Sequence, residues 1–329
     1  MNRKNFYILY YIAILSNVLL AQQTTVYTNF LLNAFSYNPA IAGSTEGTSV
    51  NMFYRNQWLG FSNDAPQTML MNVYSSLKKR PQMAFGGQIL NDKLGLFSKT
   101  MAHLTYAYHI KLNSKLKLGL GVSAGMSQIR VRLYDVKMYD KGDELLTGTI
   151  LNANAFDANA GLLLYSKKFF LGLSSLSLIS TKYNYSNAIG KNVAVYNISC
   201  GYNFNVHKDI QIQPLVLIKH SAPVPYQPEY MLKIQWKEIF WIGGAYRTYS
   251  NASFLFGLNA LNNKLKFGYA YDYSVNSIQK YNSGSHEIFV GFYFKGKEKS
   301  KDEEEFIIPD NSIKQSIKNK KNNNNDKNN

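Results

Sequence analysis

The residues that could carry catalysis or bind a metal are few in this chain, and they are scattered. Its 329 residues include one cysteine, Cys200, and five histidines. His103 and His109 are six residues apart in one predicted strand, so they face the same side but lie about 20 Å from each other. A metal shared by the two is therefore not expected. The other histidines are His207, His220 and His286.

Nucleophilic catalysis is not expected either. Ser285 directly precedes His286, and neighbouring residues in a strand face opposite ways. The sequence has no G-x-S-x-G elbow and no Gly-rich phosphate loop before a Lys-Ser or Lys-Thr pair. A single cysteine excludes a disulfide framework and a cysteine-rich metal site. We predict no enzymatic activity, no catalytic or metal-binding residue and no cofactor.

The elements that must position these side chains are β-strands. Lys117–Ser127 reads K-L-G-L-G-V-S-A-G-M-S, in which apolar residues alternate with Lys, Gly or Ser, the pattern of a half-buried strand. Val195–Asn205, Leu265–Tyr273 and Glu287–Phe294 repeat this alternation, and no long amphipathic helix competes with it. We predict strands over 46–56, 67–76, 82–90, 100–111, 116–128, 156–165, 169–176, 193–204, 210–220, 229–236, 239–246, 253–260, 265–273 and 285–294. The segments 67–76, 82–90, 169–176 and 210–220 alternate weakly, so the predicted count is about 14, within a range of 12–14.

Two all-β architectures fit this alternation: a soluble sandwich pair or propeller, and a transmembrane β-barrel. The polar face is rich in Gly, Ser, Asn and Lys, which suits a lumen, and strands often end in aromatic residues, as interfacial girdles do. If both termini are periplasmic, the periplasmic turns have at most five residues, whereas the outer connections, from 57–66 to 274–284, all have six or more. We predict a transmembrane outer-membrane β-barrel of antiparallel strands over 45–294, with short periplasmic turns and longer outer loops.

The segment 1–21 is predicted to be a secretory signal peptide. Arg3 and Lys4 precede the apolar run Phe6–Leu20, which ends at Ala21. The alternative, an N-terminal transmembrane anchor, is disfavoured because the run is short and no stop-transfer charge cluster follows. Export to the outer membrane of a Gram-negative bacterium also makes nucleic acid an unexpected partner.

Two further segments flank the predicted barrel. Gln22–Ser44 is apolar in patches and contains the turn-forming residues Pro39 and Gly43, so it is either a periplasmic leader or a plug folded into the lumen. Lys295–Asn329 is charged and rich in asparagine. It is too polar to bury a core, and we predict a disordered polar periplasmic tail.

The formal net charge of +16, from 36 Lys and Arg against 20 Asp and Glu, suggests a polyanionic partner. Much of this charge lies in the predicted short turns, whose cations are Lys78, Lys79, Arg80, Lys115, Lys167, Lys168, Lys208, Lys237 and Lys264. We predict a docking rim at the periplasmic mouth for anionic inner-leaflet lipid or an acidic periplasmic partner. The rim residues are Lys78, Lys79, Arg80, Lys167 and Lys168. The alternative is that these residues only keep the turns soluble.

The barrel also predicts one specific contact. The first and last strands of a closed barrel pair, and alternation points both Arg55 and Glu287 into the lumen near the outer ends of their strands. We predict a charge-assisted contact between these two side chains across the closure seam. The alternative is that each is solvated separately in a wet lumen.

Three motifs occur at intervals along the chain. They are Y-N-P-A-I-A-G at 37–43, Y-R-N-Q-W-L-G-F at 54–61 with A-P-Q-T at 65–68, and G-S-H-E-I at 284–288 before G-F-Y-F. Together they resemble the PorP/SprF family. The likeness runs in order along residues 22–294. That family consists of outer-membrane proteins of the type IX secretion system in Bacteroidetes.

This resemblance implies a β-barrel accessory component that supports secretion or surface attachment of particular type IX substrates, including large gliding adhesins. The implied partners are outer-membrane lipid, the type IX secretion machinery and a secreted surface protein. No catalytic residue carries over. The residues that match the motifs are Asn38, Pro39, Gly43, Arg55, Gln57, Trp58, Gly60, Pro66, Ser285, His286 and Glu287. An architectural role is the alternative for most, with Pro39 and Gly43 setting turns and Trp58 anchoring at the outer interface.

Two functions therefore stay open. The first is the secretion or surface-attachment component, and the second is a passive outer-membrane channel for a small solute. A channel needs a continuous polar path, whereas an accessory component can be plugged, for instance by Gln22–Ser44. A third possibility, a secreted soluble β protein, fails if the protein stays in the outer-membrane fraction after a carbonate wash.

Overall fold

The computed structural model describes residues 30–62, 64–132, 150–179, 182–184, 189–248 and 250–294. The predicted signal peptide at 1–21, the first residues of the predicted leader and the predicted tail at 295–329 lie outside the described residues. The expectations for those segments stay predictions. Among the described residues, no helix is long and apolar enough to cross a bilayer.

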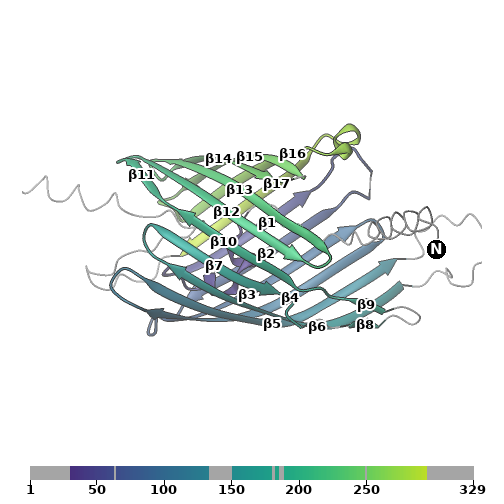
Figure 1. Ribbon diagram of the computed structural model, residues 1–329, viewed down its shortest axis with the longest axis horizontal. Helices are drawn as coiled ribbons and strands as arrows, with labels where there is room; N and C mark the ends of the chain where they lie inside the picture. Colours follow the sequence, from purple (N-terminus) through teal and green to yellow (C-terminus); the bar gives the residue numbers. More distant parts are fainter. Residues whose placement is uncertain are drawn as a thin grey trace, which may run out of the picture.

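The strands form a closed antiparallel barrel of 14 strands (Figure 1), as the alternation predicted. One strand is split into β10 and β11, which both pair with β12. The strands are β1 (Thr48–Asn56), β2 (Gln67–Ser76), β3 (Met83–Leu94), β4 (Phe97–Lys111), β5 (Lys117–Arg132), β6 (Ile150–Tyr165), β7 (Phe169–Leu176), β10 (Val195–Tyr202), β11 (Phe204–His207), β12 (Ile210–Ser221), β13 (Val224–Trp236), β14 (Phe240–Arg247), β15 (Asn251–Ala260), β16 (Leu265–Ser274) and β17 (Ser285–Phe294).

The remaining elements are short. A hairpin of β8 (Lys182–Asn184) and β9 (Ile189–Lys191) forms a separate two-stranded sheet. A 3-10 helix, η4 (Ser277–Tyr281), lies between β16 and β17. One helical turn, α2 (Ala34–Tyr37), and a 3-10 helix, η1 (Pro39–Ile41), precede the first strand. Both α2 and η1 pack inside the barrel.

The barrel closes between its first and last strands. β1 pairs with β17 in a continuous antiparallel register from Thr48 opposite Phe294 to Asn56 opposite His286. This register has no bulge, and it fixes which residues of the two strands share a face. Arg55 therefore lies directly opposite Glu287, with both side chains on the inner face.

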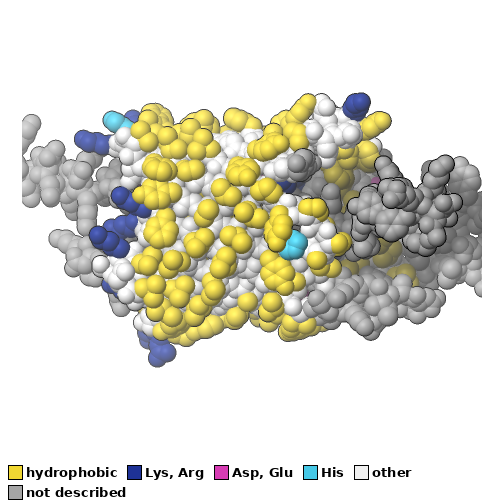
Figure 2. Space-filling model, in the orientation of Figure 1, with side chains coloured by type: hydrophobic (Ala, Val, Ile, Leu, Met, Phe, Trp, Pro, Cys, Tyr) yellow, Lys and Arg dark blue, Asp and Glu magenta, His cyan; other side chains and the backbone are white. Residues whose placement is uncertain are grey.

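The outer wall of the barrel is apolar. Burial alternates residue by residue, as in β14, where every second side chain is buried. The side chains at the alternate positions point outward and are mostly large and apolar. Leu104, for example, is 78% exposed and Phe254 is 56% exposed. Figure 2 shows this apolar surface over the visible face of the wall. A band of outward apolar side chains on a closed barrel is the surface that lipid covers.

The two ends of the barrel differ. At one end, here called the turn end, the connections are 77–82, 112–116, 166–168, 208–209, 237–239 and 261–264. At the other, here called the loop end, the longest connections are 57–66, 133–149, 177–194 and 275–284. Three loop-end connections are shorter than the six residues expected, namely 95–96, 222–223 and 248–250. The flanking strands extend into these loops and pair almost to the turn, so the predicted strands were too short at this end of the barrel.

Candidate functional site

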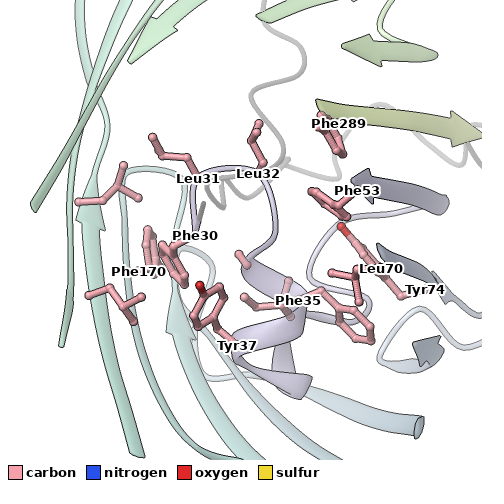
Figure 3. Close-up of a cluster of buried hydrophobic side chains, with 14 of the residues drawn as sticks. Phe30, Leu31, Leu32, Phe35, Tyr37, Phe53, Leu70, Tyr74, Phe170 and Phe289 are labelled. Carbon is pink, nitrogen blue, oxygen red and sulfur yellow. The ribbon is translucent and has the colours of Figure 1, made fainter. Parts of the chain in front are cut away.

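The N-terminal segment Phe30–Ser44 lies inside the barrel (Figure 3). Every residue from Phe30 to Ala42 is buried. Its aromatic side chains pack on inward-facing aromatic residues of the wall. The ring centroids of Phe30 and Phe170 are 6.2 Å apart, and those of Phe35 and Tyr74 are 4.7 Å apart. Much of the lumen is therefore a hydrophobic core rather than the polar space that the composition of the inner face suggested.

The wall is shaped to receive this segment. Ala107, Gly121, Gly161 and Ser174 lie opposite one another in register across β4, β5, β6 and β7, and form a row of small inward residues. A Cβ atom on Gly121 would overlap the backbone nitrogen of Ala40, and one on Gly161 would overlap the Asn38 side chain. Only glycine leaves room for the backbone of η1 at position 121 and for the Asn38 side chain at position 161.

Asn38 fixes the segment to the wall by hydrogen bonds. Its Nδ2 donates to the carbonyl oxygens of Leu162, at 2.9 Å, and Leu173, at 3.3 Å. Its Oδ1 accepts from the backbone nitrogen of Ala40 at 2.9 Å, which caps η1. Buried polar groups need such partners. The first motif of the sequence thus joins the segment to β6 and β7.

His109 holds the other end of the segment. Its Nε2 lies 2.6 Å from the carbonyl oxygen of Ala42, and its Nδ1 lies 2.8 Å from the Tyr165 hydroxyl. A neutral imidazole that donates from Nε2 and accepts at Nδ1 satisfies both contacts. The adjacent Gly43 has a positive φ of 76°, and a Cβ there would also overlap Ala84. His109 is thus an anchor for the segment.

Ion pairs lie next to the closure seam. Arg55 Nη1 is 3.5 Å from Glu287 Oε2, so the predicted contact is confirmed, and the expected alternative of separate solvation is not what the structure has. A closer partner was not predicted: the same nitrogen lies 2.6 Å from Asp272 Oδ2. All three side chains are buried. The Arg55 guanidinium therefore forms ion pairs with two buried carboxylates, one from β16 and one from β17.

A second ion pair continues this polar layer. Arg247 donates from Nη2 and Nε to Glu229 Oε2, at 2.7 and 3.0 Å, and from Nη1 to Asn251 Oδ1 at 3.2 Å. Lys219 of β12 is also buried and lies near this pair. We call six residues the ionic cluster: Arg55, Lys219, Glu229, Arg247, Asp272 and Glu287.

A third polar group includes a serine, a histidine and an aspartate, but not as a catalytic triad. Both Ser177 Oγ and His103 Nε2 lie 3.2 Å from the same oxygen, Asp157 Oδ2. The hydroxyl therefore contacts the carboxylate and not the imidazole, whereas a catalytic triad needs the serine hydroxyl on the imidazole. No group of three or more metal-binding side chains occurs within the described ranges.

The second and third motifs meet at the loop end of the seam. The backbone nitrogen of Trp58 donates to Ser285 Oγ at 3.2 Å, and that of Leu59 donates to the carbonyl of Gly284 at 2.8 Å. Trp58 has a positive φ of 52° and its ring packs against Phe61. These contacts extend the pairing of β1 with β17 beyond the strands. The motif residues at this end therefore stabilise the pairing of the first and last strands.

The other motif residues near the seam have similar local contacts. The backbone nitrogen of Gln57 donates to the carbonyl of Pro66 at 2.9 Å, which closes the connection between β1 and β2. Gly60 has a positive φ of 85°. His286 Nδ1 lies 2.6 Å from the Tyr269 hydroxyl on the outer wall. Within the part of the chain that the structure describes, Gln57, Gly60 and His286 form no hydrogen bond with the N-terminal segment.

The predicted docking-rim residues lie in two turns at the turn end. Lys78, Lys79, Arg80 and Lys168 are exposed, and Lys167 is half-buried. Figure 2 shows Lys and Arg side chains beyond the apolar band at this end. Lys237 of another turn lies over the Trp236 ring, 4.7 Å from its centroid. Whether the rim binds a partner stays a prediction.

The sequence did not identify four members of the ionic cluster as partners of Arg55 and Glu287. Asp272 could have been found, because it occupies an inward position in the alternating segment Leu265–Tyr273. Lys219 and Glu229 lie where apolar residues also point inward, so the alternation there is less clear. Arg247 lies one residue beyond the predicted strand 239–246. The one feature of the sequence that could have indicated these partners is a charged residue at an inward-facing position of a strand.

Several solved structures are similar to this chain at low sequence identity. The toluene transporter TbuX of Ralstonia pickettii is 11% identical, with 80% of this chain and 93% of that chain covered and a TM-score of 0.48. The toluene transporter TodX of Pseudomonas putida is 9% identical, with coverages of 82% and 94% and a TM-score of 0.48. A FadL homologue of Pseudomonas aeruginosa is 9% identical, with coverages of 78% and 91% and a TM-score of 0.43. These similarities carry no functional argument.

No curated protein matches the sequence. A family model described as type IX secretion system membrane protein PorP/SprF matches residues 19–292. This range covers most of the chain, including all three motifs, the N-terminal segment and nearly the whole barrel. The chain therefore belongs to the PorP/SprF family of type IX secretion system membrane proteins, and it has the outer-membrane β-barrel fold.

Proposed function

We propose that this protein is an accessory component of the type IX secretion system that supports secretion or surface attachment of specific large substrates, such as gliding adhesins. In this proposal it acts by binding protein partners and does not conduct solutes. The competing proposal is a passive outer-membrane channel for a small solute. The family supports a role in secretion, and the contents of the lumen favour the first proposal over the second.

The observation that carries the proposal is the N-terminal segment across the lumen. Phe30–Ala42 is buried. The backbone of Ala40 lies against Gly121 and the side chain of Asn38 lies against Gly161, so a side chain at either glycine would displace the segment. Apolar inward side chains such as Phe170 and Phe289 surround it. A diffusion channel needs a continuous wet path, and removing the segment would expose this apolar surface to water. We therefore propose that the segment is a lumen plug.

A pull-down from intact membranes tests the accessory role. The full chain with an affinity tag in a loop-end connection should co-purify subunits of the type IX machinery and at least one large surface protein. The control is an unrelated tagged outer-membrane barrel expressed at the same level. Recovery of the tagged protein alone, under conditions in which other type IX subunits stay associated with each other, would contradict the proposal.

We also propose that the docking rim binds an acidic protein on the periplasmic side. The supporting observation is that Lys78, Lys79 and Arg80 are exposed in one turn and that Lys and Arg side chains extend past the apolar band at this end. Opposite charges steer such an encounter and make it sensitive to salt.

Reversing Lys78, Lys79 and Arg80 to Glu is expected to reduce recovery of the periplasmic partner at least about tenfold, because three attractive contacts become repulsive. The barrel itself should fold normally, since these residues lie outside the strands. The measurement is the amount of co-purified type IX subunits by quantitative mass spectrometry. A triple reversal of Lys93, Arg130 and Lys280, exposed cations near the loop end, is the matched control. Equal recovery from both variants would refute docking of a protein at the rim. Weaker binding of the reversed variant to anionic vesicles, with unchanged protein recovery, would assign the rim to lipid instead.

A further inference from the structure

The short strand β11 has an open edge at the turn end of the wall (Figure 1). It pairs on one side with β12, and within the described part of the chain its other side has no ladder partner. The pairing on that side stops at the turn before β7, where the backbone nitrogen of Asn203 donates to the carbonyl of Lys168 at 2.7 Å. β11 continues beyond this bond. An unpaired edge of this kind is a template for another strand.

β11 lies beyond the packed part of the wall. All four of its residues are exposed, whereas a strand such as β14 buries every second residue. Its apolar side chains are Phe204, 49% exposed, and Val206, 64% exposed. The turns before β7 and before β12 hold Lys168 and Lys208, both exposed, at the two ends of this strand. Because hydrocarbon does not tolerate an open strand edge, we place this edge on the aqueous side of the interface.

The chain itself carries a segment that suits this edge. The predicted tail contains one apolar run, residues 306–308, which reads F-I-I and has a high strand propensity. Four acidic residues, 302–305, come directly before the run, and Pro309 comes directly after it. Proline has no N–H for a ladder, so a strand formed by this run would end at Ile308.

The tail is long enough to bring this segment to β11. β17 ends with Phe294 at the turn end, which is also the end where β11 lies. β11 is six strands from β17 in the order of the sheet, a separation of about 29 Å across the strands at about 4.8 Å for each. Phe306 follows Phe294 by 12 residues, and a chain of that length extends to about 40 Å.

Charge favours the same placement. The turns on either side of β11 hold Lys167, Lys168 and Lys208 against Asp209, so this part of the turn end attracts an acidic stretch. In an antiparallel pairing, residues 302–305 lie beside the Lys208 end of β11. Pro309 then falls at the other end, where the turn before β7 closes the edge.

We infer that residues 305–308 add to β11 as an antiparallel strand and hold the tail at the turn end. The backbones supply the ladder, the apolar run packs on Phe204 and Val206, and the acidic stretch lies against Lys208. The inference goes beyond the secretion role and does not depend on it. The tail would cover the part of the docking rim next to β11 and leave its other turn open to a partner.

Disulfide trapping in the purified full chain tests the inference. Cys200→Ser removes the native thiol, and one new cysteine replaces Asn205 of β11. A second new cysteine replaces residue 306, 307 or 308 in three separate proteins, so that either face of the added strand is sampled. Oxidation should join the two cysteines within one molecule in at least one of the three proteins, because a docked strand holds them at contact distance.

The matched control has its first cysteine at Lys264 instead of Asn205. Lys264 is exposed in the turn before β16, and its carbonyl accepts from the Tyr293 nitrogen, so a loose tail reaches it more easily than it reaches β11. The yield at Asn205 should exceed the yield at Lys264 at least about fivefold. Equal yields, or disulfides that form only between two molecules, would overturn the inference.

Hydrogen exchange separates a paired strand from a tail that is merely near. Ile307→Pro removes a ladder N–H from the segment, and Ile313→Pro makes the same change outside it. Amides at the open edge of β11 should exchange at least about tenfold faster in Ile307→Pro than in the unaltered protein or in Ile313→Pro. Equal exchange in all three proteins would contradict the inference.

Discussion

Replacing Gly121 and Gly161 by valine is expected to raise the ion conductance of the purified barrel in planar bilayers by about tenfold or more, because an unplugged barrel of this size leaves an aqueous path. The two residues lie opposite each other on β5 and β6. Side chains there would overlap Ala40 and Asn38, so η1 has to leave its place. The wall should persist, since valine favours strands more than glycine does.

Gly244→Val is the matched control for this experiment. Gly244 lies in β14, its added Cβ would come no nearer than 3.9 Å to another atom, and its position faces outward. This variant should conduct as little as the unaltered protein. A double variant that is folded by circular dichroism yet conducts no more than Gly244→Val would contradict the view that the segment closes the lumen. High conductance of the unaltered protein would contradict it as well.

Arg55→Met is expected to lower the free energy of unfolding by about 3–5 kcal/mol, the cost of removing one partner from a buried ion pair. Arg55 is 6% exposed, and its guanidinium forms ion pairs with both Asp272 and Glu287. The methionine side chain fills similar space but leaves two carboxylates close together without a cation. Urea unfolding of the protein in detergent micelles, followed by tryptophan fluorescence, measures the change.

The control for Arg55→Met neutralises the whole group. The triple variant Arg55→Met, Asp272→Asn, Glu287→Gln has no charge left to bury, so it should recover most of the lost stability. If the triple variant is as unstable as Arg55→Met alone, the loss comes from packing rather than from the unpaired carboxylates. The electrostatic account of the seam would then be wrong.

The barrel was predictable from sequence because a period of two is a strong signal where one face meets lipid. Val195–Asn205 and Leu265–Tyr273 place apolar residues outward at every second position, and both segments are strands of the wall. The ends of strands were less predictable. Pairing continues through polar residues such as Asp92 and Lys99, which lie opposite each other in β3 and β4.

The four weakly alternating segments have a common explanation. Their inward positions carry apolar side chains that pack in the same core as the N-terminal segment, for example Tyr74 of β2, Phe170 of β7 and Leu217 of β12. An inner face that meets a plug loses the polar character expected of a wet lumen. Weak alternation on these strands therefore marked the place where the segment packs, although the sequence alone left a leader and a plug as open alternatives.

The candidate site was predictable only where two residues meet through strand pairing. Closure of the barrel brings Arg55 opposite Glu287, and this follows from alternation and strand order. Asp272, Arg247 and Lys219 join them only because side chains reach across several strands, which depends on the shape of the filled lumen. Long-range packing of this kind leaves no periodic trace in the sequence.

Deletion of the gene, followed by comparison of surface proteins and solute uptake with the parent strain, tests the central claim most directly. We predict the loss of one or a few large type IX substrates from the cell surface, with unchanged uptake of small solutes and normal display of other outer-membrane proteins. The intact gene supplied in trans should restore display. Normal surface display of every type IX substrate, together with altered uptake of a small solute, would contradict the account and favour a channel.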